Sequence, residues 1–202
     1  MNFFVVERAR TASRFIKSTN PPYKIEQLTI IEIDKKGNQY LKEVQDLLST
    51  EVDIGLISES GMPAIADPGS EVVSLAHQSD YYIKPLTGPS SLFLALASSG
   101  MNGQSFAFRG YLPIKEGEIN KKLKQLETLI LSENQTQIFI ETPYRNDRMF
   151  KFLVNKLPNK IRLCIAKDVT GKDEYIKTLS ILDWKKKSIT IGKVPTIYII
   201  GQ

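Results

Sequence analysis

The sequence predicts an α/β protein of two domains, a parallel-sheet domain followed by a mixed-sheet α+β domain. Two observations support this prediction. In the first half, short apolar or β-branched runs alternate with helical patterns, which is typical of βαβ units. In the second half, two strand-like runs follow each other with no helix between them, which favours antiparallel pairing. The change of pattern predicts an N-terminal domain over residues 1–110 and a C-terminal domain over residues 111–202.

The first half contains four runs with the composition of buried strands, at residues 3–6, 28–33, 52–57 and 81–86. Helical patterns lie at residues 11–17, 40–48 and 71–77, and a fourth at 90–97 is apolar on nearly every side. Residues 106–113 end in Gly110 and Pro113, which predicts a strand that closes this domain and passes into a linker.

The second half opens with an amphipathic helix whose apolar face is Ile119, Leu123, Leu126 and Ile130. The elements expected after it are a strand at 137–141, a helix at 145–157, and strands at 161–167, 174–179 and 196–200. These elements predict a second domain, of the α+β class, and a cleft between the two domains.

Composition limits the function classes. The 202 residues are 42% hydrophobic with a net charge of +5, and no apolar run has the length of a membrane span or the form of a signal peptide. We therefore expect a cytoplasmic protein with no membrane partner. The single cysteine, Cys164, fits a reducing compartment and lies in a strand-like run, so a buried structural thiol is expected. One histidine and one cysteine argue against a metal site or a Ser–His or Cys–His nucleophile pair.

The most informative segment is residues 57–70, I-S-E-S-G-M-P-A-I-A-D-P-G-S, which follows one predicted strand. Its two prolines and two glycines exclude regular structure. A second Gly/Pro/Ser turn, residues 87–91, follows the next predicted strand, and residues 7–10 follow the first. Because ligands bind at the carboxyl ends of parallel strands, these three segments are expected to meet at one edge of the sheet and to form a binding site.

Familiar phosphate cradles are absent, since the sequence has neither a G-x-x-x-x-G-K-[ST] loop nor a G-x-G-x-x-G turn. A site built from backbone-rich loops with few titratable side chains suits a reaction that depends on positioning. Methyl transfer from a sulfonium donor is such a reaction, because its leaving group is neutral and already activated.

These segments resemble, in order and over the whole chain, the motifs of the ribosomal RNA small-subunit methyltransferase I family in the tetrapyrrole methylase superfamily. Residues 58–69 resemble S-D-A-G-T-P-x-I-S-D-P-G, and residues 85–91 resemble P-x-P-G-P-S-A. Residues 106–113 are similar to F-x-F-x-G-F-L-P, residues 141–145 to E-x-P-x-R, and residues 7–10 to E-D-T-R.

The resemblance implies a homodimer that binds S-adenosylmethionine (SAM) in the cleft between two α/β domains. Carried over by position, the residues that line the donor are Ser58, Gly61, Met62, Pro63 and Ile65 on one side and Gly88, Pro89, Ser90 and Ser91 on the other. Pro143 and Pro195 are expected to face the adenine. Asp67 is a further candidate cofactor residue, with capping of the following helix as the alternative.

The resemblance also implies an activity, methylation of a ribose 2′-hydroxyl of small-subunit ribosomal RNA. The catalytic candidates are Glu7, Arg10, Glu141 and Arg145, in which the carboxylates assist the hydroxyl and the arginines hold phosphate. A helix-start salt pair is the alternative for Glu7 and Arg10, and a structural cross-link is the alternative for Glu141 and Arg145. Two other functions stay open: a small-molecule methylase acting on a tetrapyrrole, and a non-catalytic protein that binds SAM or RNA.

The family has one more strand and a Pro/Gly loop ahead of the segment that matches residues 3–6. No part of this sequence resembles them, so we expect a late start or a truncated form that binds SAM poorly.

Overall fold

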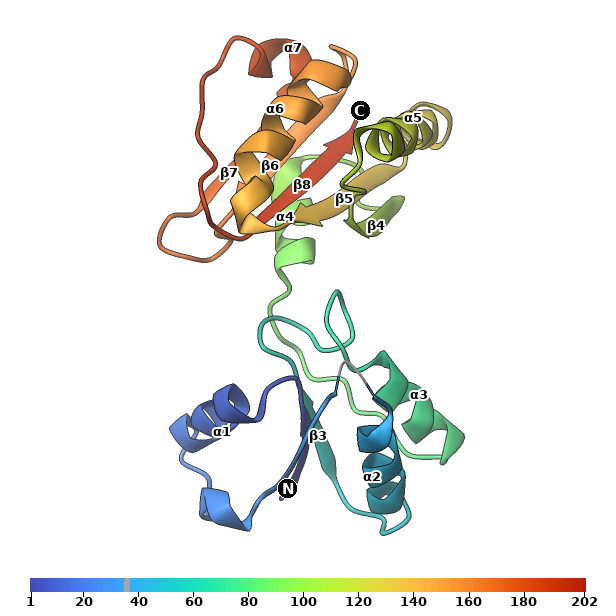
Figure 1. The fold of residues 1–202 in the computed structure, drawn as a ribbon, viewed down its shortest axis with the longest axis vertical. Helices are drawn as coiled ribbons and strands as arrows, with labels where there is room; N and C mark the ends of the chain where they lie inside the picture. The colour runs from blue at the N-terminus through green and yellow to red at the C-terminus, as the bar shows by residue number, and fades with distance from the viewer. Residues whose placement is uncertain (35–36) are drawn as a thin grey trace. The chain divides into compact units, whose positions relative to one another are not determined.

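A computed structural model describes residues 1–34 and 37–202. The chain divides into two compact units, Met1–Pro89 (unit 1) and Ser90–Gln202 (unit 2) (Figure 1). Both units combine helices with a sheet, so the predicted α/β class is confirmed. Among the described residues, no helix is long and apolar enough to span a membrane.

Unit 1 is built on a three-stranded parallel sheet in the order β2-β1-β3. Its elements, in chain order, are β1 (Phe3–Val6), α1 (Ala9–Ser18), η1 (Ile25–Gln27), β2 (Thr29–Glu32), α2 (Gln39–Leu48), β3 (Ile54–Ile57) and α3 (Ser70–Gln78). Alternate strand side chains enter two hydrophobic clusters, one beneath α1 and one beneath α2 and α3. The apolar runs therefore form strands that are covered on both faces, as parallel sheets require.

Residues 81–86 do not form the predicted strand. Tyr81 and Ile83 pack against the same cluster as Ile54 and Leu56 of β3, whereas Tyr82 is 86% exposed. The alternation of a strand is thus present. A strand also needs a hydrogen-bonded neighbour, and within the described residues β3 pairs with β1 alone.

Unit 2 is built on a five-stranded mixed sheet in the order β4-β5-β8-β6-β7. Its elements are α4 (Ser91–Ser99), β4 (Phe106–Tyr111), α5 (Glu116–Glu133), β5 (Thr136–Glu141), η2 (Pro143–Arg145), α6 (Asn146–Lys156), β6 (Arg162–Lys167), β7 (Tyr175–Ser180), α7 (Ile181–Trp184) and β8 (Thr196–Gly201). β4 and β5 are parallel, and the pairs β5–β8, β8–β6 and β6–β7 are antiparallel. The antiparallel pairing expected of the second half is confirmed.

Two elements assigned to the first domain by sequence belong to unit 2. β4 pairs with β5, and α4 packs against β6, β7 and β8. The boundary between the units in the structure therefore lies at residues 89–90 and not at residues 110–111. Local sequence shows that residues 106–111 form a strand, but the partner of that strand is 30 residues away and leaves no local signal.

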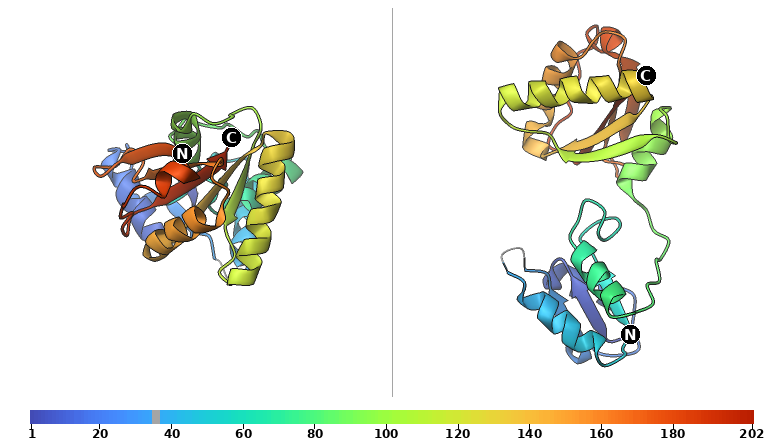
Figure 2. Two further views of the ribbon diagram at one scale, coloured as in Figure 1. Left: turned by 90° about the horizontal axis from the view of Figure 1, so that it is seen from above. Right: turned by 90° about the vertical axis from the view of Figure 1, so that its right-hand side faces the viewer.

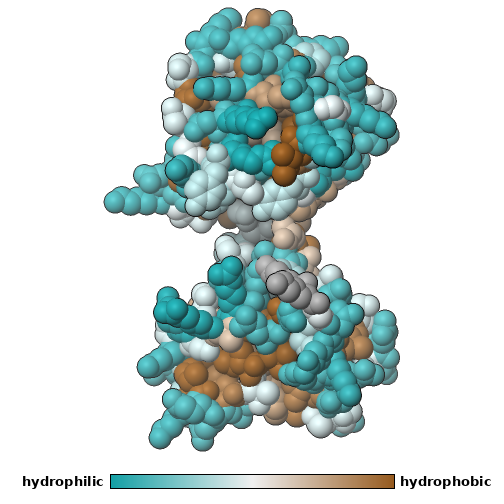
Figure 3. Space-filling view, in the orientation of Figure 1, coloured by the Kyte–Doolittle hydropathy of each residue, from teal (hydrophilic) through white to brown (hydrophobic). Residues whose placement is uncertain are grey.

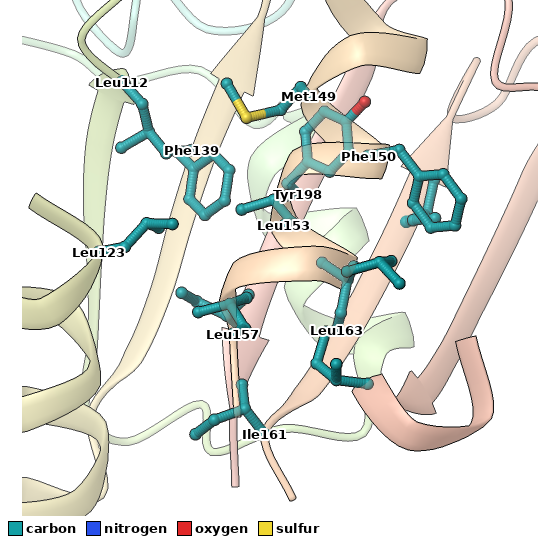
Figure 4. Packing of buried hydrophobic residues seen from close by; sticks show 14 of the residues in the cluster. Leu112, Leu123, Phe139, Met149, Phe150, Leu153, Leu157, Ile161, Leu163 and Tyr198 are labelled. Atoms are coloured by element: carbon teal, nitrogen blue, oxygen red, sulfur yellow. The ribbon is translucent and has the colours of Figure 1, made fainter. Parts of the chain in front are cut away.

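The core of unit 2 lies between its sheet and the helices α5 and α6 (Figures 2 and 4). The predicted face of α5, Ile119, Leu123, Leu126 and Ile130, is buried there. Phe139 and Tyr198 stack in the same cluster with ring centroids 5.7 Å apart. Cys164 is buried, as expected of a structural thiol, and burial raises its pKa. This packing makes the sheet a rigid base for the loops at its edges.

Candidate functional site

The loop of residues 58–69 in unit 1 is held in an unusual backbone conformation. Gly61, Ala64, Ala66 and Gly69 have positive φ values of 79°, 64°, 65° and 128°. An alanine in the left-handed region costs roughly 1–2 kcal/mol, so two such residues close together show that the surrounding structure enforces the loop shape. The Ala64 amide donates to the carbonyl of Pro68 (3.2 Å) and closes the loop on itself.

Gly69 ends this loop at the start of α3, and its lack of a side chain is required there. A Cβ at this position would lie 3.0 Å from Cδ2 of Leu56, and φ is in the left-handed region. Gly69 is also the N-cap of α3, which has no side-chain cap. Asp67, the alternative capping residue, is half-buried two positions earlier.

The structure brings together segments at the carboxyl ends of β1 and β3. The amide of Glu59 donates to Oε2 of Glu7 (3.2 Å), which joins the turn after β1 to the loop after β3. A Cβ placed on Gly61 would lie 3.9 Å from the carbonyl oxygen of Pro89, so Pro89 reaches the same loop. Within unit 1, the segments after β1 and β3 therefore lie together with Pro89, although residues 81–86 form no strand of the sheet.

Space is available at this edge for a ligand. A Cβ on Gly88 would meet no atom within 4 Å. Gly61, Gly88 and Pro89 are exposed, and Met62 and Pro63 are half-buried. Small residues with exposed backbone groups are what a ligand held by N–H and C=O groups requires.

Besides the candidate Glu7, two hollows in unit 1 contain acidic residues that the sequence analysis did not single out. One, of about 610 Å³, is lined by Ile33, Asp34, Gly37, Asn38, Tyr40, Pro68 and Glu71. The other, of about 370 Å³, is lined by Glu7, Arg8, Glu32, Ile33 and Asp34. In the larger hollow the Tyr40 hydroxyl donates to Oε2 of Glu71 (2.5 Å). The two residues are 31 positions apart on different helices, so no sequence pattern could have paired them.

The chemistry of Tyr40 follows from its surroundings. Burial, the hydrogen bond to Glu71 and the charge of Glu71 together raise the pKa of Tyr40 to about 12. The phenol is therefore a neutral hydrogen-bond donor at physiological pH.

In unit 2 the candidate residues Glu141 and Arg145 form an ion pair at the end of β5. Nη2 of Arg145 lies 3.0 Å from Oε2 of Glu141, whose side chain is 1% exposed. The other oxygen, Oε1, accepts from the amide of Thr142 (2.7 Å). The Arg145 side chain is 28% exposed, so the pair joins a buried carboxylate to a partly exposed arginine.

Pro143 and Pro195 follow and precede, respectively, the last residue pair of the β5–β8 ladder. Glu141 pairs with Thr196 in the antiparallel ladder, and Pro143 and Pro195 stand just beyond these two residues. Pro195 is exposed and Pro143 is half-buried. Nζ of Lys193 lies 5.4 Å from the centre of the exposed Tyr144 ring. The edge offers flat apolar surfaces beside basic groups, which suits a nucleobase or nucleotide.

The other candidate residues lie at the start of α1, in the loop at residues 58–69 and at the start of α4. Arg10 is exposed on the first turn of α1, and the amide of Ala9 in the same turn donates to Oε2 of Glu32 (2.7 Å). Ser58 Oγ lies 3.5 Å from the carbonyl of Gly61 inside the loop. Ile65 is 41% exposed, Ser90 is buried at the N-cap of α4, and Ser91 is exposed. In the described part of the chain, no group of three or more His, Cys, Asp or Glu side chains could hold a metal ion.

Sequence comparison finds relatives over most of the chain. A protein named ribosomal RNA small subunit methyltransferase I from Vibrio cholerae is 27% identical over 183 residues, which are 91% of this chain and 61% of the relative. A protein of the same name from Buchnera aphidicola subsp. Baizongia pistaciae is 33% identical over 76% of this chain and 52% of the relative. The chain thus spans between half and two thirds of the length of these relatives.

Comparison with solved structures supports the fold. Diphthine synthase superposes with a TM-score of 0.63 at 11% identity, over 98% of this chain and 78% of that one. The methyltransferase CobJ superposes with a TM-score of 0.58 at 14% identity, over 100% of this chain and 95% of that one. The model of the family described as Tetrapyrrole (Corrin/Porphyrin) Methylases matches residues 5–183. The resemblance found in the motifs is therefore confirmed, and the chain belongs to the tetrapyrrole methylase family.

Proposed function

We propose that this protein is a SAM-dependent methyltransferase whose substrate is small-subunit ribosomal RNA, with a ribose 2′-hydroxyl as the acceptor. The observation that carries the proposal is the meeting of the strained loop at residues 58–69 with Glu7 and Pro89 at the carboxyl edge of the parallel sheet. The named activity of the similar proteins supplies the RNA part of the proposal.

The donor-binding residues proposed from unit 1 are Ser58, Gly61, Met62, Pro63, Ile65, Asp67, Gly88 and Pro89. Unit 2 contributes Ser90, Ser91, Pro143 and Pro195. The open space around Gly88 fits a bound group, and the exposed face of Pro195 fits a purine ring. SAM supplies an activated methyl group on sulfur, which leaves as a neutral thioether.

The protein's own residues orient the RNA and its hydroxyl. A ribose hydroxyl is a weak nucleophile, so a carboxylate near the cofactor edge has to accept its proton, and Glu7 is our candidate. Arg10 and Arg145 hold phosphate groups of the RNA. Glu141 is buried, so we assign it a positioning role: its carboxylate orients Arg145 and does not itself reach the substrate.

Positive charge on the surface supports an RNA partner. In unit 2 the lysines of α5 and α6 and Lys185, Lys186 and Lys187 are exposed or half-buried, and hydrophilic side chains dominate the face seen in Figure 3. Contacts between lysine side chains and RNA phosphates are electrostatic, so the affinity for RNA is expected to fall as the salt concentration rises. A ribosomal substrate and a single free cysteine together support a place in the cytoplasm.

We also propose that the protein is a homodimer. Phe93 of α4 and Phe106 of β4 are 47% and 38% exposed and contact each other edge to face, with centroids 6.1 Å apart. β4 is an edge strand of its sheet, and no strand of the described residues pairs with its outer edge, so an apolar surface lies beside an open strand edge. Light scattering is the test, and a Phe93→Ser, Phe106→Ser double variant is expected to be monomeric where the wild type is dimeric.

The activity is tested with radiolabelled SAM and isolated small ribosomal subunits. A 2′-O-methyl group blocks alkaline cleavage of the neighbouring phosphodiester, so the label is expected in an alkali-resistant dinucleotide. Label in the mononucleotides that alkali releases would show methylation of a base instead. Transfer to a tetrapyrrole but not to RNA would establish the small-molecule alternative, and SAM binding without transfer to either would establish a binding protein.

A further inference from the structure

A buried side chain links the two proline-bearing segments at the edge of unit 2. Asn146, the first residue of α6, is 0% exposed. Its Nδ2 lies 3.1 Å from the carbonyl oxygen of Gly192, 2.7 Å from that of Val194 and 3.1 Å from Oγ1 of Thr196. One amide group thus contacts three positions in the segment that leads into β8.

The orientation of this amide follows from its partners. Thr196 Oγ1 donates its own proton to the carbonyl of Val194 (3.0 Å), so it faces Asn146 as an acceptor. With acceptors on all three contacts, the nitrogen of the amide has to point toward this segment. An aspartate or an apolar residue could not satisfy the same groups.

Neighbouring residues reinforce the arrangement. Oδ1 of Asp147 accepts from the amide of Ile191 (2.7 Å). The Tyr198 hydroxyl, which lies at the Met149 end of the cluster in Figure 4, donates to the carbonyl of Asn146 (3.0 Å). Burial, with the nearby charges of Asp147 and Glu141, raises the pKa of Tyr198, so this hydroxyl remains a donor.

The hydrogen bonds of Asn146 and Asp147 matter because the sheet ladder ends before the prolines. The ladder between β5 and β8 stops at Glu141 and Thr196. Beyond it, the hydrogen bonds found between residues 142–147 and 191–195 in the described chain are made by Asn146 and Asp147. A proline has no N–H, so its position depends on its carbonyl and on its neighbours. The carbonyl of Pro195 accepts from the amide of Asp168 (2.9 Å), and the bonds of Asn146 hold this segment against the start of α6.

We infer that Asn146 is a positioning residue for donor binding: it fixes the spacing of Pro143 and Pro195 and so shapes the surface that receives the adenosine part of the donor. The inference rests on the proposed function, because the two prolines are proposed to contact the donor. A shift of about 1 Å in binding groups can cost roughly 100-fold in function, so loss of this link should be measurable.

The test compares Asn146→Ala with a matched control, Trp184→Phe. Trp184 is also fully buried in unit 2 and donates one side-chain hydrogen bond, from Nε1 to the carbonyl of Leu163 (2.8 Å), but among the described residues it makes no hydrogen bond to residues 191–196. Both variants are expected to lower the free energy of unfolding in urea. S-adenosylhomocysteine is the probe, and its affinity is measured by calorimetry.

Asn146→Ala is expected to weaken binding of the probe by about 10-fold or more, while Trp184→Phe binds like the wild type. A second readout needs no ligand. Lys193 is exposed within the linked segment, so trypsin should cleave after Lys193 faster in Asn146→Ala than in the wild type or the control. If Asn146→Ala does not fold, Thr196→Val removes one of its acceptors and is expected to shift both readouts in the same direction.

The outcomes distinguish a failure of the proposed function from a failure of this inference alone. If the wild type does not bind the probe, the proposed function fails and this inference fails with it. If the wild type binds and Asn146→Ala binds equally well, only the inference is overturned. Equal weakening in Asn146→Ala and Trp184→Phe would also overturn it, because the role of Asn146 would then be general stability.

Discussion

Nη2 of Arg145 lies 3.0 Å from Oε2 of Glu141, and the carboxylate is almost completely buried while the guanidinium is partly exposed. The pair joins the end of β5 to the start of α6. Burying a carboxylate is costly unless a cation stays beside it, so the pair ties the fold of unit 2 to the position of a proposed phosphate-binding group.

Breaking this pair from one side should destabilise unit 2. Arg145→Met leaves the buried carboxylate without its cation and is expected to lower the free energy of unfolding by about 3 kcal/mol. Glu141→Gln leaves a guanidinium that solvent can reach, so its cost should be about 1 kcal/mol. Urea denaturation of both variants and of the double variant measures the coupling, and costs that simply add would contradict the pairing.

Filling the open space at Gly88 should block the donor without disturbing the fold. Gly88 is outside the left-handed region and a Cβ there meets nothing, so Gly88→Ala should leave the melting temperature nearly unchanged. S-adenosylhomocysteine affinity should fall by about 10-fold, one methyl group being enough to exclude a ligand atom from close contact. Gly103→Ala is the matched control, because Gly103 is equally open but lies in another loop.

Gly61 is a less suitable position for this experiment. Its φ of 79° would strain any side chain, so a loss of binding there would combine strain with exclusion. Normal binding by Gly88→Ala would remove the turn at residues 87–91 from the proposed site.

Removing the charge of Arg10 should weaken RNA binding and lower its salt dependence. Each lost phosphate contact reduces the slope of log K against log salt by about 0.7 for a single strand. Lys17 lies near the other end of α1, is also exposed, and provides the control Lys17→Gln. Filter binding at several salt concentrations gives both slopes, and equal slopes for Arg10→Gln and the wild type would exclude Arg10 from the RNA contact.

The Tyr40–Glu71 hydrogen bond predicts a loss of stability in alkaline solution. The folded-state pKa of Tyr40 is raised from 10.0 to about 12, so the fold favours the protonated phenol. This contribution is complete below pH 10 and is lost as pH rises from 10 through 12. Tyr40→Phe should be less stable than the wild type at pH 8 by about 1 kcal/mol, because it lacks the hydrogen bond.

Above pH 10 the difference between the two proteins should shrink, since the wild type then has to deprotonate a buried phenol or keep it protonated at a cost. Unfolding free energies of both proteins at pH 8, 10 and 11.5 provide the measurement. Parallel pH curves for wild type and Tyr40→Phe would show that Tyr40 does not titrate in this way.

The sequence by itself determined the types of most elements and the place of the candidate loops. The 4-3-4 spacing of Ile119, Leu123, Leu126 and Ile130 predicts one buried helix face, because a helix turns every 3.6 residues, and that face is buried in the structure. The Gly/Pro-rich segment at residues 58–69 predicts a loop after a buried strand, and it takes up a strained conformation there. These are local properties, set by side chains close together in the chain.

Only the tertiary structure decided which elements pair. The sequence analysis predicted strands at both 106–113 and 81–86, yet residues 106–111 join the sheet of unit 2 through β5 and residues 81–86 join no ladder in the described chain. Tyr40 with Glu71, and Asn146 with Val194, likewise come from distant parts of the sequence. Hydrogen bonds between strands and between buried side chains depend on partners tens of residues away, and the periodicity of a single segment carries no information about such partners.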